Sequence, residues 1–197
     1  MTLDQNWFSE TCEECGSAFS LKIHQQLESV KTDFQTIDIY DTVKFGKLMV
    51  IDGFIMLSSR DNFLYHEMMS HPAMFTHINP QKVVIVGGGD CGTLREVLRH
   101  DSVHEAWQIE IDEQVTRLSE KYFPELCESN HDPRANLYFG DGIQWMKDAE
   151  PDSLDIIIID STDPIGPAEG LFGKPFYQDC IKALKADGIL VQQSESP

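Results

Sequence analysis

Five carboxylates follow apolar runs in the second half of this 197-residue sequence: Asp90, Glu110, Asp141, Asp160 and Asp163. A carboxylate can hold an ammonium group, accept hydrogen bonds from a sugar hydroxyl, or take the proton that an amine loses as it becomes a nucleophile. Any one of them could instead cap a helix or close a turn. Because most come where a predicted strand ends, we expect a shared acidic site.

The stretch "VVIVGGGDCGTLREVL" (83–98) joins a β-branched run, a glycine turn and a helical pattern. Gly87, Gly89 and Gly92 have the GxGxxG spacing of a nucleotide-binding turn, whose N–H groups usually receive phosphate. Asp90 lies inside this turn and would repel a phosphate. The expected ligand is therefore a positively charged nucleoside without phosphates, such as an adenosyl sulfonium compound.

The other carboxylates could contact the sugar of such a ligand and an amine that reacts with it. Glu110 ends a predicted strand 18 residues after Gly92, where an acidic side chain accepts hydrogen bonds from a ribose. Asp160 and Asp163 could hold an ammonium group and accept its proton. The Gly- and Pro-rich stretch 164–173 is long enough to form a mobile lid.

The elements that must position these residues alternate along the second half of the chain. Continuous apolar runs at 83–86 and 156–159 are typical of parallel strands covered on both faces. We therefore predict an α/β fold, a Rossmann-like doubly wound sheet. Its strands are expected at 82–86, 106–110, 136–139, 155–159 and 188–192, and its helices at about 92–100, 112–121, 142–148 and 174–186.

The first half follows a different pattern. Residues 19–58 alternate between polar and apolar with turn residues between, which predicts short antiparallel strands. The predicted domains are an N-terminal β-strand domain (1–60), a connecting helical segment (61–80) that Pro72 bends or divides, and a Rossmann-like catalytic domain (81–197).

Composition narrows the classes of partner. The formal net charge is −18, which disfavours nucleic acid and favours cationic ligands. No run approaches the roughly 18–20 apolar residues that a membrane span needs, and the first residues lack the basic and apolar regions of a secretory signal. We expect a cytoplasmic protein that does not bind membranes. "HEMMSH" (66–71) is one residue too long for the HExxH zinc motif, so no metal is expected.

Six segments together resemble the spermidine synthase (polyamine aminopropyltransferase) family of bacterial type. They are "NWFSE", "LMVIDGFIMLSSRDNFLYHEMMSHP", "GGGDCGTLREVLRH", "EIDE", "GDG" and "DSTDPIGPAEGLF". The resemblance runs from Trp7 to the last residue, and it implies a class I methyltransferase-like fold. It also implies transfer of the aminopropyl group of decarboxylated S-adenosylmethionine, a co-substrate, to putrescine, giving spermidine and methylthioadenosine. No cofactor is implied, and the implied assembly is a homodimer or homotetramer.

The resemblance assigns roles on the donor side. Asp90 would bind the aminopropyl ammonium and Glu110 the ribose hydroxyls. Asp90 would also repel the carboxylate of intact S-adenosylmethionine. The other implied donor contacts are Gln35, His66, Asp141 with Gly142 at the adenine, and Pro167 against the methylthioadenosine part.

On the acceptor side, the resemblance makes Asp160 the proton acceptor. Ser161, Thr162 and Asp163 would complete, with Asp160, the segment that holds the acceptor amine. Tyr65 matches a tyrosine that helps to orient the attacking nitrogen.

Two departures from the family pattern stand out. Cys91 replaces a glycine or another small residue, and we expect the small thiol to be tolerated on the condition that this position does not need a positive φ. Family members also usually continue beyond the length of this chain, so the last predicted strand could form an uncovered sheet edge.

Two other functions remain open. One is an S-adenosylmethionine-dependent amine N-methyltransferase, against which Asp90 argues. The other is an inactive truncated relative that only binds a nucleoside or a polyamine.

Overall fold

Residues 3–13, 16–164 and 166–194 are described by a computed structural model. They fall into two units, Met1–Phe63 and Leu64–Pro197, each of which we describe by itself. Most of the predicted connecting segment, from Leu64 on, belongs to the second unit, and the predicted three-part division stays a prediction. In the part of the chain that the structure describes, no helix is long and apolar enough to span a membrane.

The first unit is one five-stranded antiparallel sheet in which the strands pair in chain order. Its strands are β1 (Trp7–Cys12), β2 (Ser17–Lys31), β3 (Thr36–Thr42), β4 (Lys47–Ile51) and β5 (Phe54–Ser58). This confirms the antiparallel β-strands predicted from the alternating pattern.

The β4–β5 hairpin shows how local sequence specifies this sheet. Asp52 and Gly53 have φ values of 50° and 90°, as a two-residue turn between antiparallel strands requires. Asp52 Oδ1 also accepts a hydrogen bond from Thr36 N at 2.8 Å. Leu48 and Val50 of β4 are fully buried in the core of the unit, so the alternation and the turn favour the same register.

The second unit contains a five-stranded parallel sheet of order β10-β9-β6-β7-β8. Its strands are β6 (Lys82–Gly87), β7 (Glu105–Glu110), β8 (Ala135–Phe139), β9 (Leu154–Asp160) and β10 (Leu184–Gln192). Its helices are α1 (Asn62–Thr76), α2 (Gly92–Leu98), α3 (Glu113–Tyr122), α4 (Gly142–Asp148), the 3-10 helix η1 (Gly166–Phe172) and α5 (Lys174–Ala183).

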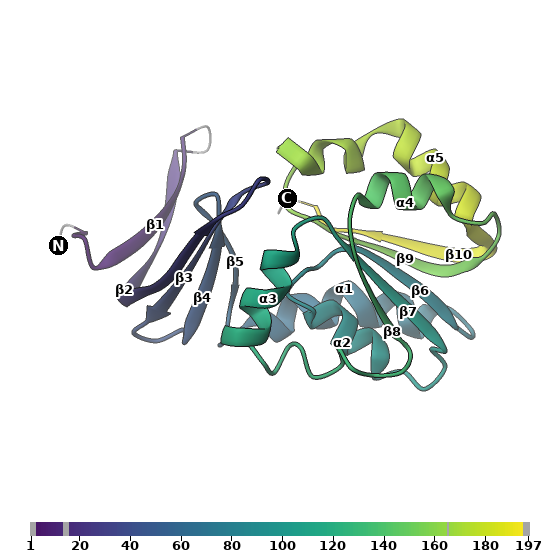
Figure 1. Cartoon of the computed structure of the whole chain (residues 1–197), viewed down its shortest axis with the longest axis horizontal. Coiled ribbons are helices and arrows are strands. Elements are labelled where there is room, and N and C mark those ends of the chain that lie inside the picture. The colour runs from purple at the N-terminus through teal and green to yellow at the C-terminus, as the bar shows by residue number, and fades with distance from the viewer. Residues whose placement is uncertain (1–2, 14–15, 165, 195–197) are drawn as a thin grey trace. The chain divides into compact units, whose positions relative to one another are not determined.

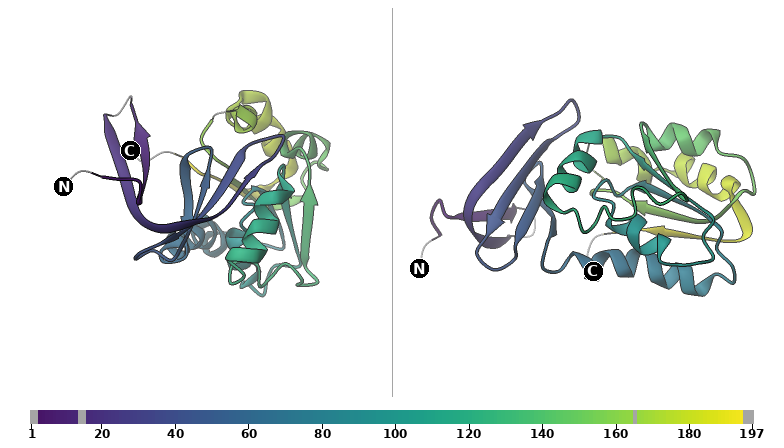
Figure 2. Two further views of the ribbon diagram at one scale, coloured as in Figure 1. Left: turned by 60° about the vertical axis from the view of Figure 1, so that its left-hand side comes forward. Right: turned by 60° about the horizontal axis from the view of Figure 1, so that its bottom comes forward.

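Helices cover both faces of this sheet (Figures 1 and 2). Alternate residues of β6 point to opposite faces. Val83 and Ile85 pack in a core with residues of α1 and α2, whereas Val84 and Val86 pack with residues of α4, η1 and α5. Burial on both faces explains the continuous apolar run and confirms the predicted Rossmann-like doubly wound fold.

The structure corrects two details of the predicted helices. The last helix ends at Ala183 rather than at 186, because Leu184 is already extended (ψ 140°) and pairs with Leu154 of β9. Pro72 does not divide α1, which continues to Thr76. Packing of Ala73 and Met74 in the core offsets the one backbone hydrogen bond that a proline removes.

The predicted edge position of the last strand is confirmed. Strand β10 lies at one end of the sheet order and pairs only with β9 among the described strands.

Candidate active site

The site lies where the strand order reverses, between β6 and β9. Gly87 of β6 pairs with Asp160 of β9, so that both strands end together. The next two strands end at the same edge of the sheet, since Glu110 pairs with Phe139. Ligands of doubly wound sheets bind at such a switch point, outside the carboxyl ends of the strands.

The glycine turn after β6 is pressed against the end of β9. Gly87 has a φ of 84°, and a Cβ atom at this position would overlap the Asp160 carbonyl group. Gly88 N donates a hydrogen bond to the Asp160 carbonyl oxygen at 2.7 Å. A side chain at 87 would force the two strand ends apart, so glycine here brings the turn and Asp160 together.

Asp90 is held from two sides. Its Oδ1 accepts a hydrogen bond from Gly92 N at 2.7 Å, and His66 Nε2 lies 3.2 Å from each carboxylate oxygen. Burial by itself raises the pKa of Asp90, but the charge and hydrogen bond of His66, the Gly92 N–H and Arg95 outweigh it, so the pKa lies below its ordinary value. Asp90 is therefore a carboxylate, suited to an ammonium group.

His66 is almost fully buried and packs against the start of α2, where a Cβ atom at position 92 would collide with its ring. Burial lowers the pKa of His66 and Arg95 adds to this, but the charge and hydrogen bond of Asp90, with the charge of Asp160, raise it above its ordinary value. The structure thus brings His66 into the predicted acidic site.

Glu110 is buried at the end of β7 beside the glycine turn. Its Oε1 accepts a hydrogen bond from Asp112 N at 2.8 Å. Burial raises the pKa of Glu110 to about 7, with the charges of Asp112 and Asp160 adding to the rise and backbone N–H groups of Asp112 and Gly89 opposing it. Around neutral pH, this carboxyl group therefore changes between two protonation states.

Asp160 lies at the centre of the site, and its side chain accepts two hydrogen bonds from hydroxyl groups. Tyr65 Oη donates to Oδ1 at 2.5 Å, and Thr93 Oγ1 donates to Oδ2 at 2.6 Å. Burial is the largest cause that raises the pKa of Asp160, and the charge of Asp90 adds to it. His66 and the two hydroxyl groups oppose the rise. A carboxylate with a raised pKa is better matched to accepting a proton.

The segment after Asp160 continues along the same edge. Ser161 Oγ donates a hydrogen bond to the Thr162 carbonyl oxygen at 3.0 Å. Asp163 Oδ1 accepts one from Gln193 Nε2 at 3.3 Å, which ties the segment to the residue after β10. All three residues 161–163 are partly exposed, so they remain accessible to a ligand.

Asp141 and Gly142 follow β8. Asp141 Oδ1 accepts hydrogen bonds from Ile143 N at 2.8 Å and Gln144 N at 3.3 Å, so this residue caps α4. A Cβ atom at Gly142 would lie 2.6 Å from a methyl carbon of Val86, which explains the glycine. Helix capping accounts for one carboxylate oxygen, and contact with an adenine stays a prediction.

Two predicted donor contacts cannot be placed at this edge. Gln35 closes a turn of the first unit, where its N–H donates to Thr32 Oγ1 at 3.1 Å. Pro167 belongs to η1, but its side chain and residue 165 lie outside what the structure describes. The rest of the predicted lid is partly anchored, because Ala168 and Leu171 are buried in the core beside α4 and α5.

Sequence reasoning missed two residues of the site, Thr93 and Gln193. Thr93 lies at the start of α2 and Gln193 follows β10, the neighbour of β9 in the sheet, and only the tertiary structure brings them to Asp160 and Asp163. Thr93 directly follows the glycine turn, which was the available signal.

The condition set for Cys91 is not met, although its thiol fits into the interior. Its φ is 70°, in the left-handed region that a non-glycine residue seldom adopts. The buried thiol offsets part of this strain. Gln108 Nε2 donates to Cys91 Sγ at 3.4 Å, and Sγ lies 3.6 Å from the Gly89 carbonyl oxygen.

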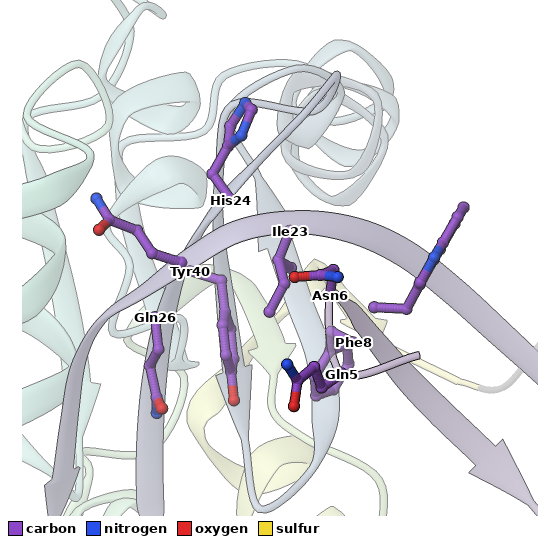
Figure 3. Close-up of a pocket in the computed structure, with 9 residues that line it drawn as sticks. Gln5, Asn6, Phe8, Ile23, His24, Gln26 and Tyr40 are labelled. Atoms are coloured by element: carbon purple, nitrogen blue, oxygen red, sulfur yellow. The ribbon is translucent and has the colours of Figure 1, made fainter. Parts of the chain in front are cut away.

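The first unit holds a separate pocket of about 390 Å³ (Figure 3). None of the predicted site residues lines it. Its lining comes from the start of the chain and from β1, β2 and β3: Gln5, Asn6, Trp7, Phe8, Ile23, His24, Gln25, Gln26 and Tyr40.

Fold and site together define a class. The sheet is doubly wound, and buried carboxylates lie at its switch point, where dinucleotide-binding proteins receive phosphate. These features place the chain among the Rossmann-like transferases of the class I methyltransferase type.

Comparison with known families is more specific. Residues 62–197 match the spermine/spermidine synthase domain, and residues 6–59 match the spermidine synthase tetramerisation domain. The chain belongs to the spermidine synthase (polyamine aminopropyltransferase) family, whose members are transferases.

Similar proteins and structures agree. The polyamine aminopropyltransferases of Xanthomonas axonopodis pv. citri and Nitrosococcus oceani are 62% and 64% identical over 100% of this chain, which covers 69% and 70% of their lengths. A crystal structure of a spermidine synthase with the transition-state analogue AdoDATO superposes with a TM-score of 0.94 at 39% identity, covering 100% of this chain and 67% of that one. The crystal structure of spermidine synthase from Thermotoga maritima gives a TM-score of 0.91 at 40% identity. This match covers 97% of this chain and 64% of that one.

Proposed function

We propose that this chain transfers the aminopropyl group of decarboxylated S-adenosylmethionine to putrescine, giving spermidine and methylthioadenosine. The observation that carries the proposal is the pair of carboxylates at neighbouring strand ends. Asp90 has a lowered pKa and suits an ammonium group that stays protonated, whereas Asp160 has a raised pKa and suits a proton acceptor.

The reaction needs alignment and deprotonation. The amine nitrogen attacks the aminopropyl carbon bonded to the sulfonium, the carbon–sulfur bond breaks, and methylthioadenosine leaves with the electron pair. The nitrogen loses one proton, which Asp160 takes. Because the sulfonium is already a good leaving group, holding the two substrates in line supplies much of the acceleration.

The donor would be held along the edge of the sheet. Asp90 binds its ammonium group and Glu110 its ribose hydroxyls, as the partly buried Asp90 after β6 and the buried Glu110 at the end of β7 support. Asp141 with Gly142 would contact the adenine. His66, Gln35 and Pro167 complete the proposed donor contacts.

The acceptor would lie on the other side of Asp160. Tyr65 is 39% exposed and directs its hydroxyl group to Asp160, so it can orient the attacking nitrogen. The residues Ser161, Thr162 and Asp163 would hold the amine, and Asp163 suits the distal ammonium group of a diamine. Cadaverine or a longer amine is the alternative acceptor.

The match of the first unit to a tetramerisation domain supports a homo-oligomer, and we propose a homodimer or homotetramer. A cytoplasmic location, independence of metals and cofactors, and the lack of nucleic-acid or membrane binding stay predictions.

One assay tests the function against its alternatives. The chain is incubated with putrescine and either decarboxylated or intact S-adenosylmethionine, and the products are identified by mass. We expect spermidine from the decarboxylated donor alone. N-methylputrescine from the intact donor would replace the proposal with an amine N-methyltransferase, and binding without product would indicate an inactive relative.

A further inference from the structure

The hydroxyl group of Thr93 makes its hydrogen bond outside the helix in which it lies. Thr93 is the second residue of α2, so Gly89, four residues earlier, precedes the helix. The Gly89 carbonyl oxygen accepts a hydrogen bond from Thr116 Oγ1 at 2.8 Å. Thr93 reaches across to β9 and donates to Asp160 Oδ2 at 2.6 Å.

The two oxygens of Asp160 lie in different surroundings. Thr93 is 0% exposed, and a Cβ atom at Gly88 would lie 2.8 Å from Oδ2, so Oδ2 faces the packed interior. Oδ1 contacts only the hydroxyl group of Tyr65 among the hydrogen bonds of the described residues, and Tyr65 is partly exposed. Oδ1 is therefore the oxygen on the accessible side.

We propose that Thr93 is a positioning residue that anchors Oδ2 of Asp160 and leaves Oδ1 as the atom that takes the acceptor's proton. This inference rests on the proposed function, since it assumes that Asp160 is the proton acceptor. A hydrogen bond to one oxygen fixes the plane of the carboxylate, and a fixed base transfers a proton over a short and constant distance.

The hydrogen bond from Thr93 also opposes the effects that raise the pKa of Asp160. Burial and the charge of Asp90 disfavour ionisation of this carboxyl group, whereas His66, Thr93 and Tyr65 favour it. Glu110 on β7 lies close enough for the charge of Asp160 to contribute to the raised pKa of Glu110. The charge of Asp163, on the segment after β9, contributes to the raised pKa of Tyr65. Without the Thr93 hydroxyl group, the pKa of Asp160 should rise.

The test replaces Thr93 by Val, which has nearly the same shape and no hydroxyl group, and by Ser, which keeps the hydroxyl group. In single-turnover experiments with excess enzyme, we expect Thr93→Val to slow transfer by roughly 10- to 100-fold, the range for losing a hydrogen bond to a charged group. The acidic limb of its pH–rate profile should move to higher pH. Thr93→Ser should restore both the rate and the limb.

Two further measurements separate positioning from a structural role. The Kd for methylthioadenosine should stay close to the wild-type value in Thr93→Val, and the Tm should fall only by the few degrees that loss of one buried hydrogen bond costs. Thr93→Ala serves as a smaller variant should valine fold poorly. The Asp160 carboxyl group can also be titrated by ¹³C NMR, with Asp160→Asn for its assignment. This titration requires no turnover, so its result is distinct from failure of the proposed function. If neither Thr93→Val nor Thr93→Ala changes the titration of Asp160 or the acidic limb, the inference is overturned, even if turnover falls.

Discussion

The imidazole of His66 faces the carboxylate of Asp90 with Nε2 at 3.2 Å from both oxygens. The pair joins α1 to the glycine turn, and each partner favours the charged form of the other. Asp90 is thus prepared as an anion before any ligand binds. An ammonium group that binds Asp90 must share it with His66, so the pair determines how strongly a cationic ligand is held.

Replacing Asp90 by Asn should weaken binding of decarboxylated S-adenosylmethionine by roughly 10- to 100-fold, because a charge-assisted contact with the ammonium group is lost. Methylthioadenosine lacks that group and should bind about as well as before. Isothermal titration of both ligands checks this, and an equal loss for both would show that Asp90 acts on the adenosyl part or on folding. The preference against intact S-adenosylmethionine should also decrease.

Glu110 should make nucleoside binding depend on pH around neutrality. Its pKa is about 7, and only the ionised form accepts hydrogen bonds from both ribose hydroxyls. If binding requires that form, the Kd for methylthioadenosine should rise roughly tenfold from pH 8 to pH 6. Methylthioadenosine is the suitable probe because it lacks the ammonium group that would involve Asp90 and His66. Glu110→Gln should bind more weakly with little pH dependence, and a pH-independent wild-type Kd would contradict the assignment.

The raised pKa of Glu110 also affects stability. A carboxyl group with a higher pKa in the folded than in the unfolded state contributes stability at low pH, and this contribution is lost as pH rises through the folded pKa. Glu110→Gln should therefore raise the Tm at pH 8.5, where wild type must bury a charge, and have a smaller effect at pH 5. Thermal unfolding at both pH values measures the difference. A Tm change that is the same at both would exclude titration as its cause.

Replacing Asp160 by Asn should keep donor binding and reduce turnover by roughly 10²- to 10⁴-fold, the usual contribution of a general base. Asparagine preserves the shape and can still accept a hydrogen bond from Thr93. Asp163→Asn is the matched control, since it should mainly raise the KM for putrescine. Unchanged turnover in Asp160→Asn would refute its assignment as proton acceptor.

At position 91, glycine should give a more stable protein than alanine, which is the reverse of the usual order within a helix. Its φ of 70° strains any residue with a Cβ atom, so Cys91→Gly should be more stable than Cys91→Ala by about 1 kcal/mol. Both variants lose the buried sulfur and leave Gln108 Nε2 without that partner. Urea unfolding of the two variants measures the difference in the free energy of unfolding. Equal stability would mean that the backbone relaxes at this position.

The sequence by itself determined the type and order of the elements around the site. The apolar runs of β6 and β9, the glycine turn and the "DG" hairpin at Asp52 act through local backbone preferences and burial, which a periodic pattern records. Because parallel strands end at one edge, the convergence of Asp90, Glu110 and Asp160 could also be predicted from strand ends alone.

Only the tertiary structure decided how those carboxylates are held. Thr93 and Asp160 are far apart in the chain, and they meet because β9 returns beside β6. The positive φ of Cys91 and the early end of α5 at Ala183 likewise depend on packing and strand pairing rather than on local propensity. Protonation states follow the same rule. Burial and neighbouring charges, which depend on contacts between distant segments, separate the lowered pKa of Asp90 from the raised pKa of Asp160.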